Sequence, residues 1–288
     1  MSENDASQTE STYVVDAENA AEMARVMMQA RLISDDMGEL FPSHLDLPTV
    51  RNVLDIACGP GQWVLDVARQ YPYMQVTGVD ISQLMIAYAT SLVKDLPTPN
   101  VHFQLMDVRQ ALDFPSQSFD VVHARFLTAF MHASMWPQLL HECQRVLKPG
   151  GTLCLIEGEN FGISNSGSLE LCNSLMVSAM RRAGHCFAPE GNMFGITALM
   201  PRLLQEQNFQ NIKQKAYALN FSSGRAENGP WFTNCKTALK LLQPFLVQWG
   251  VSTQQEANAL YERALIEMQS PDFCGQSFYM AVSGEKPL

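Results

Sequence analysis

The first residues whose types and spacing could do chemistry lie in the segment 53–61. An apolar run, VLDIA (53–57), is followed by Cys58-Gly59-Pro60-Gly61 and then by a helix-forming stretch. A glycine-rich turn between a strand and a helix lets the backbone approach a ligand at the helix N-terminus. We therefore interpret this turn as part of a nucleotide-type binding site.

Two ligand classes use such a turn, dinucleotides and S-adenosylmethionine, and the neighbouring residues favour the second. A pyrophosphate is disfavoured beside an anion, yet Asp55 lies just before the turn and 53–67 contain no Lys or Arg. The dinucleotide pattern G-x-G-x-x-G also fails, because Val64 stands at its third glycine position. The sulfonium and ammonium groups of S-adenosylmethionine tolerate a nearby carboxylate.

Acids also end the next two predicted strands. Asp80 follows a strand predicted over 75–79 and lies 21 residues after Gly59, where an acid can accept from two ribose hydroxyls. Asp107 follows a strand predicted over 101–105, where a carboxylate can accept from an adenine amino group. Dinucleotide enzymes share the first acid, so Asp80 alone does not separate the two ligand classes.

The elements that must position these residues alternate regularly. Strands are predicted over 53–57, 75–79, 101–105, 119–124 and 152–157, and helices over 16–35, 62–71, 82–97 and 136–147, the last one stopped by KPGG (148–151). This alternation predicts a parallel, doubly wound α/β sheet with right-handed crossovers. Further helices are predicted over 166–184, 196–208, 231–249 and 253–268, and strands over 212–221 and 277–283.

Composition excludes several classes of protein. The 288 residues are 47% hydrophobic and 17% charged, which is globular composition, and the net charge is −10 with a pI near 5.0. Residues 1–40 hold nine acids and two bases, so most of the net charge lies there. An acidic chain lacks the basic surface of a nucleic-acid or anionic-membrane binder. We expect no nucleic-acid partner.

Cysteine usage and apolar runs bear on location. The chain has seven cysteines and no Cys-x-x-Cys pair, as expected for free thiols in a reducing compartment. No apolar run reaches membrane-spanning length, and the polar, acidic beginning is unlike a signal or transit peptide. We expect a cytoplasmic protein without a membrane span, and the oligomeric state is left open.

Four segments resemble motifs of the class I S-adenosylmethionine-dependent methyltransferases, particularly those that act on small molecules. They are VLDIACGPGQW (53–63), VTGVDIS (76–82), QLMDVRQALDFPSQSFDVVHARF (104–126) and ECQRVLKPGGTLCLIE (142–157), in the family's order. The resemblance covers about 50–160. It implies a Rossmann-like, seven-stranded sheet that is mostly parallel, with an antiparallel last strand and helical inserts over the active site.

The resemblance also implies a division of the chain. A disordered acidic N-terminus is expected over 1–12 and a helical segment or lid over 13–48. The S-adenosylmethionine-binding core is expected over 49–160. Residues 161–288 are expected to supply substrate-covering helices and the last two strands of the same domain.

Cofactor-binding residues are carried over position by position. The resemblance implies that Asp55, Ala57, Cys58, Gly59 and Gly61 line the methionine and ribose, and that Asp80, Ile81 and Met85 frame the ribose and adenine. Asp107 and Val108 would meet the adenine, and the backbone 123–126, including Arg125 and Phe126, would pass beside the methionine. Ala57 replaces the motif's usual first glycine, and we expect it to be accommodated with a negative φ.

Candidates for catalysis and for acceptor binding are less distinctive. His132 follows the fourth strand and Glu157 ends the fifth, and both are catalytic candidates, although an exposed loop or strand end would explain them as well. Tyr13, Arg25 and His185 are substrate-side candidates. No metal site is expected, because Cys58 has no partner ligand nearby in the sequence.

Apolar residues of the inserts suggest the kind of acceptor. Met176, Met180, Met193, Phe187 and Phe194 concentrate adaptable side chains there, which favours a small, largely apolar acceptor, although simple helix packing would explain them too. Three other functions stay open at this point: a protein methyltransferase, a related protein that binds the cofactor without methyl transfer, and a dinucleotide oxidoreductase. We expect methyl transfer to an O, N or C atom of a small molecule.

Overall fold

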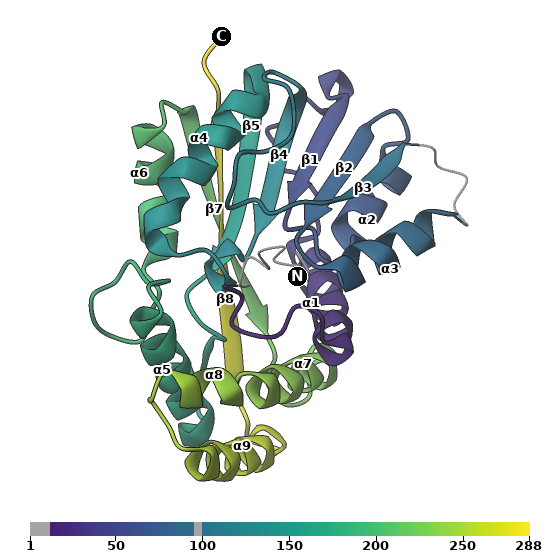
Figure 1. Ribbon diagram of the computed structural model, residues 1–288. Coiled ribbons are helices and arrows are strands. Elements are labelled where there is room, and N and C mark those ends of the chain that lie inside the picture. The colour runs from purple at the N-terminus through teal and green to yellow at the C-terminus, as the bar shows by residue number, and fades with distance from the viewer. Residues whose placement is uncertain (1–11, 95–99) are drawn as a thin grey trace, which may run out of the picture.

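A computed structural model describes residues 12–94 and 100–288 and is built on one twisted sheet (Figure 1). Its strands run in the order β3-β2-β1-β4-β5-β8-β6, and β7 pairs with β8. Their bounds are β1 Asn52–Ile56, β2 Gln75–Asp80, β3 Val101–Leu105, β4 Phe119–Arg125, β5 Leu147–Gly158, β6 Ile163–Ser164, β7 Gln210–Asn220 and β8 Gly275–Glu285.

The first five strands form the predicted parallel, doubly wound core. β1 pairs in parallel with β2 on one side and β4 on the other, so the order reverses beside β1 and the carboxyl ends of these strands meet at one edge. β8 runs antiparallel to β5, which confirms the expected direction of the last strand. Ligands of open α/β sheets bind where the order reverses, and here that place is the end of β1.

The described sheet has eight strands, so the predicted number of seven is wrong. The additional strand is the short β6. Its two residues pair with Gly275 and Gln276 at the start of β8. Gly162, at φ 112°, lets the chain turn there, since a Cβ would lie 2.4 Å from the Gln276 carbonyl oxygen. A two-residue strand has too little periodicity to be predicted from sequence.

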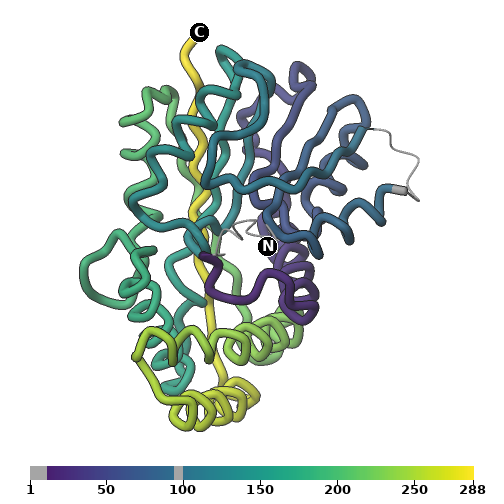
Figure 2. The backbone as a smooth tube through the Cα atoms, viewed as in Figure 1, coloured from purple at the N-terminus to yellow at the C-terminus, as the bar shows by residue number. Residues whose placement is uncertain are grey.

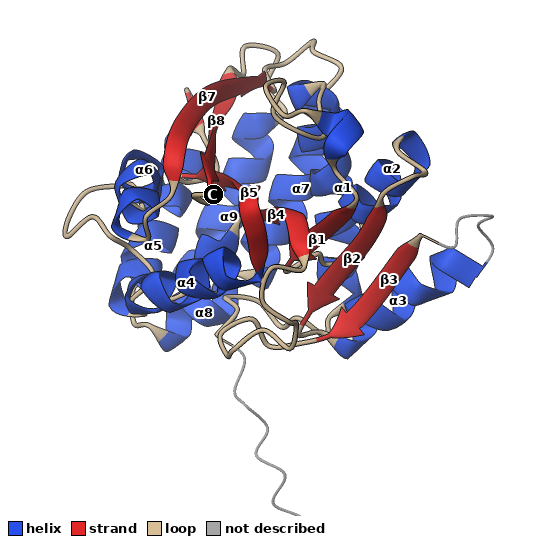
Figure 3. Cartoon of the chain, turned by 90° about the horizontal axis from the view of Figure 1, so that it is seen from above, coloured by secondary structure: helices blue, strands red, loops and turns tan. Residues whose placement is uncertain are grey.

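Helices cover both faces of the sheet. α2 (Gln62–Gln70) packs through Trp63 and Val64 on one face, while α4 (Trp136–Val146) and α6 (Ile196–Glu206) pack on the other through Leu140 and Met200, among others. α3 (Gln83–Lys94) packs against β2 and β3. The view from above separates the sheet from its helices (Figure 3).

A second helical layer lies beyond the carboxyl edge of the sheet. It consists of α5 (Gly167–Arg182), α7 (Asn228–Leu241), α8 (Gln243–Gln248) and α9 (Gln254–Met268), with α1 (Ala20–Met37) packed on α7 (Figure 1). The stretch 12–19 crosses between this layer and the sheet (Figure 2). Residues distant in sequence therefore enclose the carboxyl edge from both ends of the chain.

Several predicted boundaries move for local reasons. α1 begins at Ala20 instead of residue 16, because the Asn19 side chain accepts hydrogen bonds from the backbone N–H groups of Ala21 and Glu22 and caps the helix. The helix predicted over 231–249 is divided between α7 and α8, with Pro244 in the first turn of the second.

The KPGG segment was predicted only to end the preceding helix. In the structure it is already part of β5, which begins at Leu147. Ser82 caps α3 as expected, since its Oγ accepts from the Met85 N–H at 3.1 Å. The predicted disorder of 1–12 falls, apart from Thr12, outside the described residues.

Candidate functional site

A cavity of about 250 Å³ lies at the carboxyl edge of the sheet, beneath the stretch 12–17. The turns after β1, β2, β3, β4 and β5 all contribute to its wall, together with α1, α5, α7 and β8. Of the predicted site residues, the following line it: Tyr13, Arg25, Ala57, Gly59, Asp80, Ile81, Met85, Asp107, Val108, Arg125, Phe126 and Glu157. The fold thus gathers most of the candidates around one space.

The turn after β1 is held in left-handed backbone conformations. Gly59 has φ 55° and Gly61 has φ 80°, and a Cβ on Gly61 would lie 2.4 Å from the Phe103 ring. The expectation of a negative φ at Ala57 is wrong, because its φ is 55°. Phe126, after β4, has φ 56°. Two non-glycine residues in this costly region, both at the cavity, mark backbone strain stored at a binding site.

Asp80 joins the turns after β1 and β2. Its carboxylate accepts from the Gly59 N–H at 2.8 Å and from the Ser82 N–H at 2.9 Å. Burial raises its pKa, and the backbone donors oppose that rise. Among the described residues no Lys, Arg or His forms an ion pair with it. A half-buried carboxylate at the cavity wall therefore has no cationic partner within the described part of the chain.

Asp107, the acid after β3, is by contrast fully engaged. Arg109 donates from Nε at 2.8 Å and from Nη2 at 2.9 Å to its two oxygens. Burial alone would raise the pKa of Asp107, but the hydrogen bonds and charge of Arg109 lower it overall. Arg109 also donates to Thr12 Oγ1 at 3.1 Å, which links the end of β3 to the N-terminal stretch.

Asp55 does not line the cavity. Its Oδ1 is 2.8 Å from His123 Nδ1, and the His123 ring stacks on Trp63 at a centroid distance of 3.7 Å. Burial lowers the pKa of His123 despite the carboxylate, so the neutral ring donates its Nδ1–H to Asp55. The carboxylate thus ties β1 to β4 below the turn. Cys58 and Gly61 also lie outside the lining and shape the turn from behind.

Side-chain and backbone hydrogen bonds anchor the N-terminal stretch across the cavity. Thr12 Oγ1 donates to the Phe130 carbonyl at 2.7 Å, and the Val14 N–H donates to the Ala129 carbonyl at 3.2 Å. Further along, the Glu18 carboxylate accepts from the first backbone N–H groups of α3, at 2.9 and 3.0 Å. The stretch is therefore attached to the turns on both sides of the cavity.

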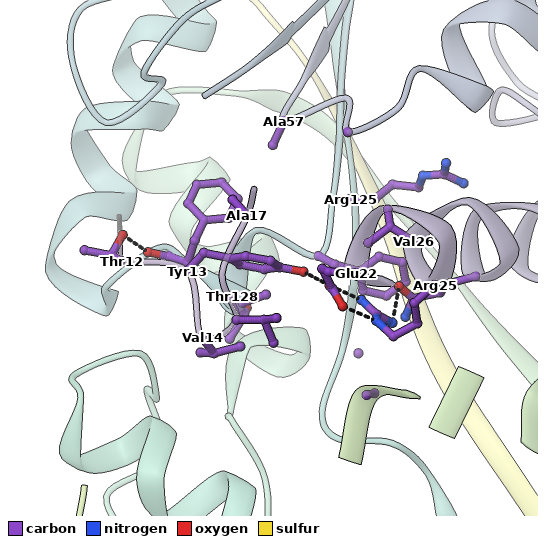
Figure 4. Close-up of a pocket in the computed structure, with 18 of the residues that line it drawn as sticks. Thr12, Tyr13, Val14, Ala17, Glu22, Arg25, Val26, Ala57, Arg125 and Thr128 are labelled. Carbon is purple, nitrogen blue, oxygen red and sulfur yellow. Dashed lines mark hydrogen bonds and ion pairs between the residues drawn. The ribbon is translucent and has the colours of Figure 1, made fainter. Parts of the chain in front are cut away.

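An ion pair is buried where α1 meets α7 (Figure 4). Glu22 and Arg25 are 0% and 8% exposed, and two hydrogen bonds of 2.6 and 2.7 Å join them. Tyr13 Oη donates to Glu22 at 2.5 Å, and Arg25 Nη1 donates to Asn234 Oδ1 at 3.0 Å. Burial and the Glu22 charge both raise the pKa of Tyr13, so its hydroxyl keeps its proton.

Glu157 holds the turn after β4. It accepts from the Leu127 N–H at 2.6 Å and from Thr128 Oγ1 at 3.0 Å, and it is 1% exposed. Burial raises its pKa to about 8, against the effect of these donors. A carboxyl group that titrates near neutral pH therefore lies at the cavity wall.

The two histidine candidates lie elsewhere. Neither His132 nor His185 lines the cavity. Their rings pack edge to face at 4.8 Å, and His185 Nδ1 is 3.0 Å from the Thr128 carbonyl oxygen. Burial, with a smaller contribution from His132, lowers the pKa of His185 to about 4. His132 follows β4 and His185 follows α5, and neither position brings its ring to the cavity.

The far end of the cavity is mostly apolar, and part of it was missed from sequence. Phe161, Met176, Met180, Phe194 and Leu242 line it, as does Val15. The polar residues missed from sequence include Glu22, Ser277 and Tyr279. Glu22 could have been found from its spacing to Arg25, because residues three apart on one helix are neighbours. Ser277 and Tyr279 could have been placed on one face from the two-residue alternation along the last strand.

No three His, Cys, Asp or Glu side chains of the described residues lie close enough together to form a metal site. None of the described helices has both the length and the apolar character that crossing a bilayer requires.

Comparison with known proteins identifies the core. Residues 53–151 match the family model described as "Methyltransferase domain". Demethylmenaquinone methyltransferase of Listeria welshimeri is 37% identical over 110 residues, which are 37% of this chain and 44% of that protein. Methyltransferase pytC of Aspergillus terreus is 27% identical over 195 residues, 67% of this chain and 55% of that protein. The chain thus spans about half the length of these curated relatives.

A solved structure agrees with the fold. The YcgJ protein of Bacillus subtilis superimposes with a TM-score of 0.52 at 16% identity, covering 93% of this chain and 99% of that one. At this identity the likeness concerns the architecture: a mostly parallel sheet with one antiparallel strand and flanking helices.

Proposed function

We propose that the chain contains a class I S-adenosylmethionine-dependent methyltransferase domain and transfers the methyl group of S-adenosylmethionine to a small, largely apolar acceptor. The match of residues 53–151 to a methyltransferase domain supports this proposal. The acceptor atom is an O, N or C. A relative named for demethylmenaquinone supports a small-molecule acceptor, and a second relative named as a methyltransferase supports methyl transfer.

The observation that carries this proposal is the continuity of the cavity. One space reaches from the strained turn at Ala57 and the Asp80 carboxylate to the apolar side chains Phe161, Met176 and Met180. A donor bound at one end and an acceptor bound at the other would lie in the same cavity, with no bulk water between them. Positioning and exclusion of water are what methyl transfer chiefly asks of a protein.

The residues present fit the methyl donor. Asp80 offers a carboxylate without a cationic partner among the described residues, which suits ribose hydroxyls, and Gly59 brings the backbone to the cavity without a side chain. Arg125 lines the same end, and its Nη1 donates to Ser34 Oγ at 3.3 Å. When bound, the donor would supply a methyl group on a sulfonium: the acceptor bonds to the methyl carbon in line with the carbon–sulfur bond, which breaks and releases a neutral thioether.

The chain's own residues then have separate tasks. The stretch 12–17 covers the space, and Asp80 and Met85 hold the cofactor end. Glu157 keeps the turn after β4 in place. Its raised pKa of about 8 leaves it mostly protonated at pH 7, so it can take a proton from a weakly acidic acceptor only in its ionised form, which increases as the pH approaches 8. His132 has no role in this proposal.

Product analysis tests the proposal. The protein is incubated with S-adenosylmethionine and a panel of phenols, amines and activated carbon acids, with an unstructured peptide mixture as a separate arm. Mass spectrometry then measures S-adenosylhomocysteine and methylated product. Methylation of apolar small molecules supports the proposal. Methylation of peptides alone, or donor binding without any transfer, would contradict it and favour one of the alternatives left open by the sequence.

A further inference from the structure

Four buried polar atoms gather at one wall of the cavity without hydrogen-bond partners among the described residues. They are Trp231 Nε1 and Asn234 Nδ2 of α7 and Ser277 Oγ and Tyr279 Oη of β8. Each residue is at most 4% exposed. Folded proteins leave few buried polar atoms unpaired, and a group of them calls for a binding partner. Three of the four residues line the cavity, and Asn234 lies one helical turn from Trp231.

Packing brings these side chains together. Ser277 and Tyr279 share one face of β8, two residues apart, with Gly275 next on the same face. The Phe221 ring fills the space over Gly275, 2.1 Å from the Cβ that glycine lacks, and stacks on Trp231 at 5.1 Å. Burial raises the pKa of Tyr279, and the neighbouring Ser277 hydroxyl opposes that rise. The indole and the two hydroxyls therefore border the same part of the space.

The surroundings of these polar atoms are apolar and aromatic. The Phe126 ring packs edge to face on Tyr279 at 5.7 Å. Met176, Met180 and Leu242 line the same cavity. A ligand that fits here needs an apolar body, most readily a flat ring, and a polar atom directed at the wall formed by α7 and β8.

The unpaired atoms specify the kind of polar atom. An indole N–H can only donate a hydrogen bond, and so can the Asn234 NH₂ group, because Asn234 Oδ1 already accepts from Arg25. The Ser277 and Tyr279 hydroxyls can donate as well. The ligand atom that satisfies this wall must therefore be an acceptor, such as the oxygen of a phenol, a phenolate or a conjugated ketone.

The same wall disfavours an ammonium group. An ammonium has no lone pair with which to accept from the indole, and the carboxylate at this end, Glu22, is already paired with Arg25 at 2.6 Å. Burying a further cation without a counter-charge is costly.

Resting on the proposed methyltransferase function, we propose that the acceptor is an apolar ring compound that bears a hydrogen-bond-accepting oxygen. Tyr279, Ser277 and Trp231 hold that oxygen. Aliphatic amines, which are cations at neutral pH, are disfavoured by the same residues. The substrate class is therefore phenolic or ketonic.

A matched set of probes tests this inference. Calorimetry measures the binding of 2-naphthol, naphthalene and 2-naphthylmethylamine to the full chain, with and without saturating S-adenosylhomocysteine. We expect 2-naphthol to bind about tenfold more tightly than naphthalene, since each hydrogen bond to an otherwise unpaired buried group is worth about that factor. The amine should bind most weakly.

Conservative variants assign the effect to residues. Tyr279→Phe keeps the ring and should weaken 2-naphthol binding about tenfold without changing naphthalene binding, and Ser277→Ala should act in the same direction. Tyr88→Phe is the control, because Tyr88 is a half-buried tyrosine of α3 outside the cavity lining. Thermal unfolding of each variant confirms that it is folded.

The outcomes separate this inference from the proposed function. Equal affinities for 2-naphthol and naphthalene, tighter binding of the amine, or equal weakening of both ring compounds by Tyr279→Phe would overturn it. Failure of S-adenosylhomocysteine to bind the wild-type chain would overturn the proposed function instead. The naphthol comparison without S-adenosylhomocysteine decides the inference in either case.

Discussion

The two ends of the cavity are built in different ways. The cofactor end consists of turns after successive strands, and Asp80 and Gly59 there are linked through backbone donors, 21 residues apart. The acceptor end joins segments from opposite ends of the chain, as in the hydrogen bond between Arg25 and Asn234, which are 209 residues apart. Local backbone geometry therefore shapes one end, and a long-range hydrogen bond of a buried arginine helps to shape the other.

The largest effect is expected at the acceptor end. Glu22→Leu leaves Arg25 buried beside α7 without its carboxylate, and losing one member of a buried pair costs about 3–5 kcal/mol. Urea unfolding should report this loss in the free energy of unfolding. The double variant Glu22→Leu/Arg25→Met removes both charges and should recover much of the stability. If the single variant were as stable as wild type, the acceptor end would not depend on this ion pair.

A pH effect should follow from Glu157. Its folded pKa of about 8 lies above that of an ordinary glutamate, so the folded chain keeps a proton that the unfolded chain loses. The free energy of unfolding should therefore fall as pH rises, by about 3 kcal/mol between about pH 5 and pH 7.5. Glu157→Gln imitates the protonated acid and should flatten this dependence. Parallel pH profiles for the two proteins would contradict the assignment.

Relief of strain should be measurable at the cofactor end. Ala57→Gly removes a side chain from a left-handed conformation that costs about 1–2 kcal/mol, offset by about 0.5–1 kcal/mol of added freedom in the unfolded chain. Denaturant unfolding should show a net gain of about 0.5–1 kcal/mol. Ala24→Gly, on the exposed side of α1, is the matched control and should lose about 1 kcal/mol. A loss at both positions would mean that Ala57 is unstrained.

The smallest effect concerns the stretch over the cavity. Glu18→Gln keeps the shape of the side chain but removes its negative charge from the start of α3, which should cost about 0.3–1 kcal/mol. The loss should shrink with added salt, because the side chain is exposed. A salt-independent loss would point to the hydrogen bonds instead of the charge.

The cofactor end was largely predictable because its signals are local. Strand, turn and acid follow one another within short segments, so the placing of Gly59 and Asp80 at one edge could be read from spacing alone. The role of Asp55 could not, because its partner His123 lies on another strand and the pair is set by sheet register. The sign of φ at Ala57 likewise depends on the whole turn.

The acceptor end was predictable only in its composition. Methionine and phenylalanine in the inserts indicated apolar lining, and Tyr13 and Arg25 were candidates, but their common partner Glu22 counted only as one acid of a charged segment. Ser277 and Tyr279 lie in an alternating strand, and the alternation indicates that they share a face without indicating that this face borders the cavity. His132 and His185 were candidates by position, and the packing of the turn after β4 against α5 directs them away.

Calorimetric titration with S-adenosylhomocysteine tests the central claim most directly. The wild-type chain should bind one equivalent and should not bind NADH. Asp80→Asn should weaken S-adenosylhomocysteine binding by at least about tenfold, because a ribose hydroxyl loses a charged acceptor. Asp113→Asn, a change at an exposed position outside the cavity lining, should leave the affinity unchanged. No binding by the wild type, or binding that ignores Asp80, would contradict the account of this cavity as a methyl-donor site.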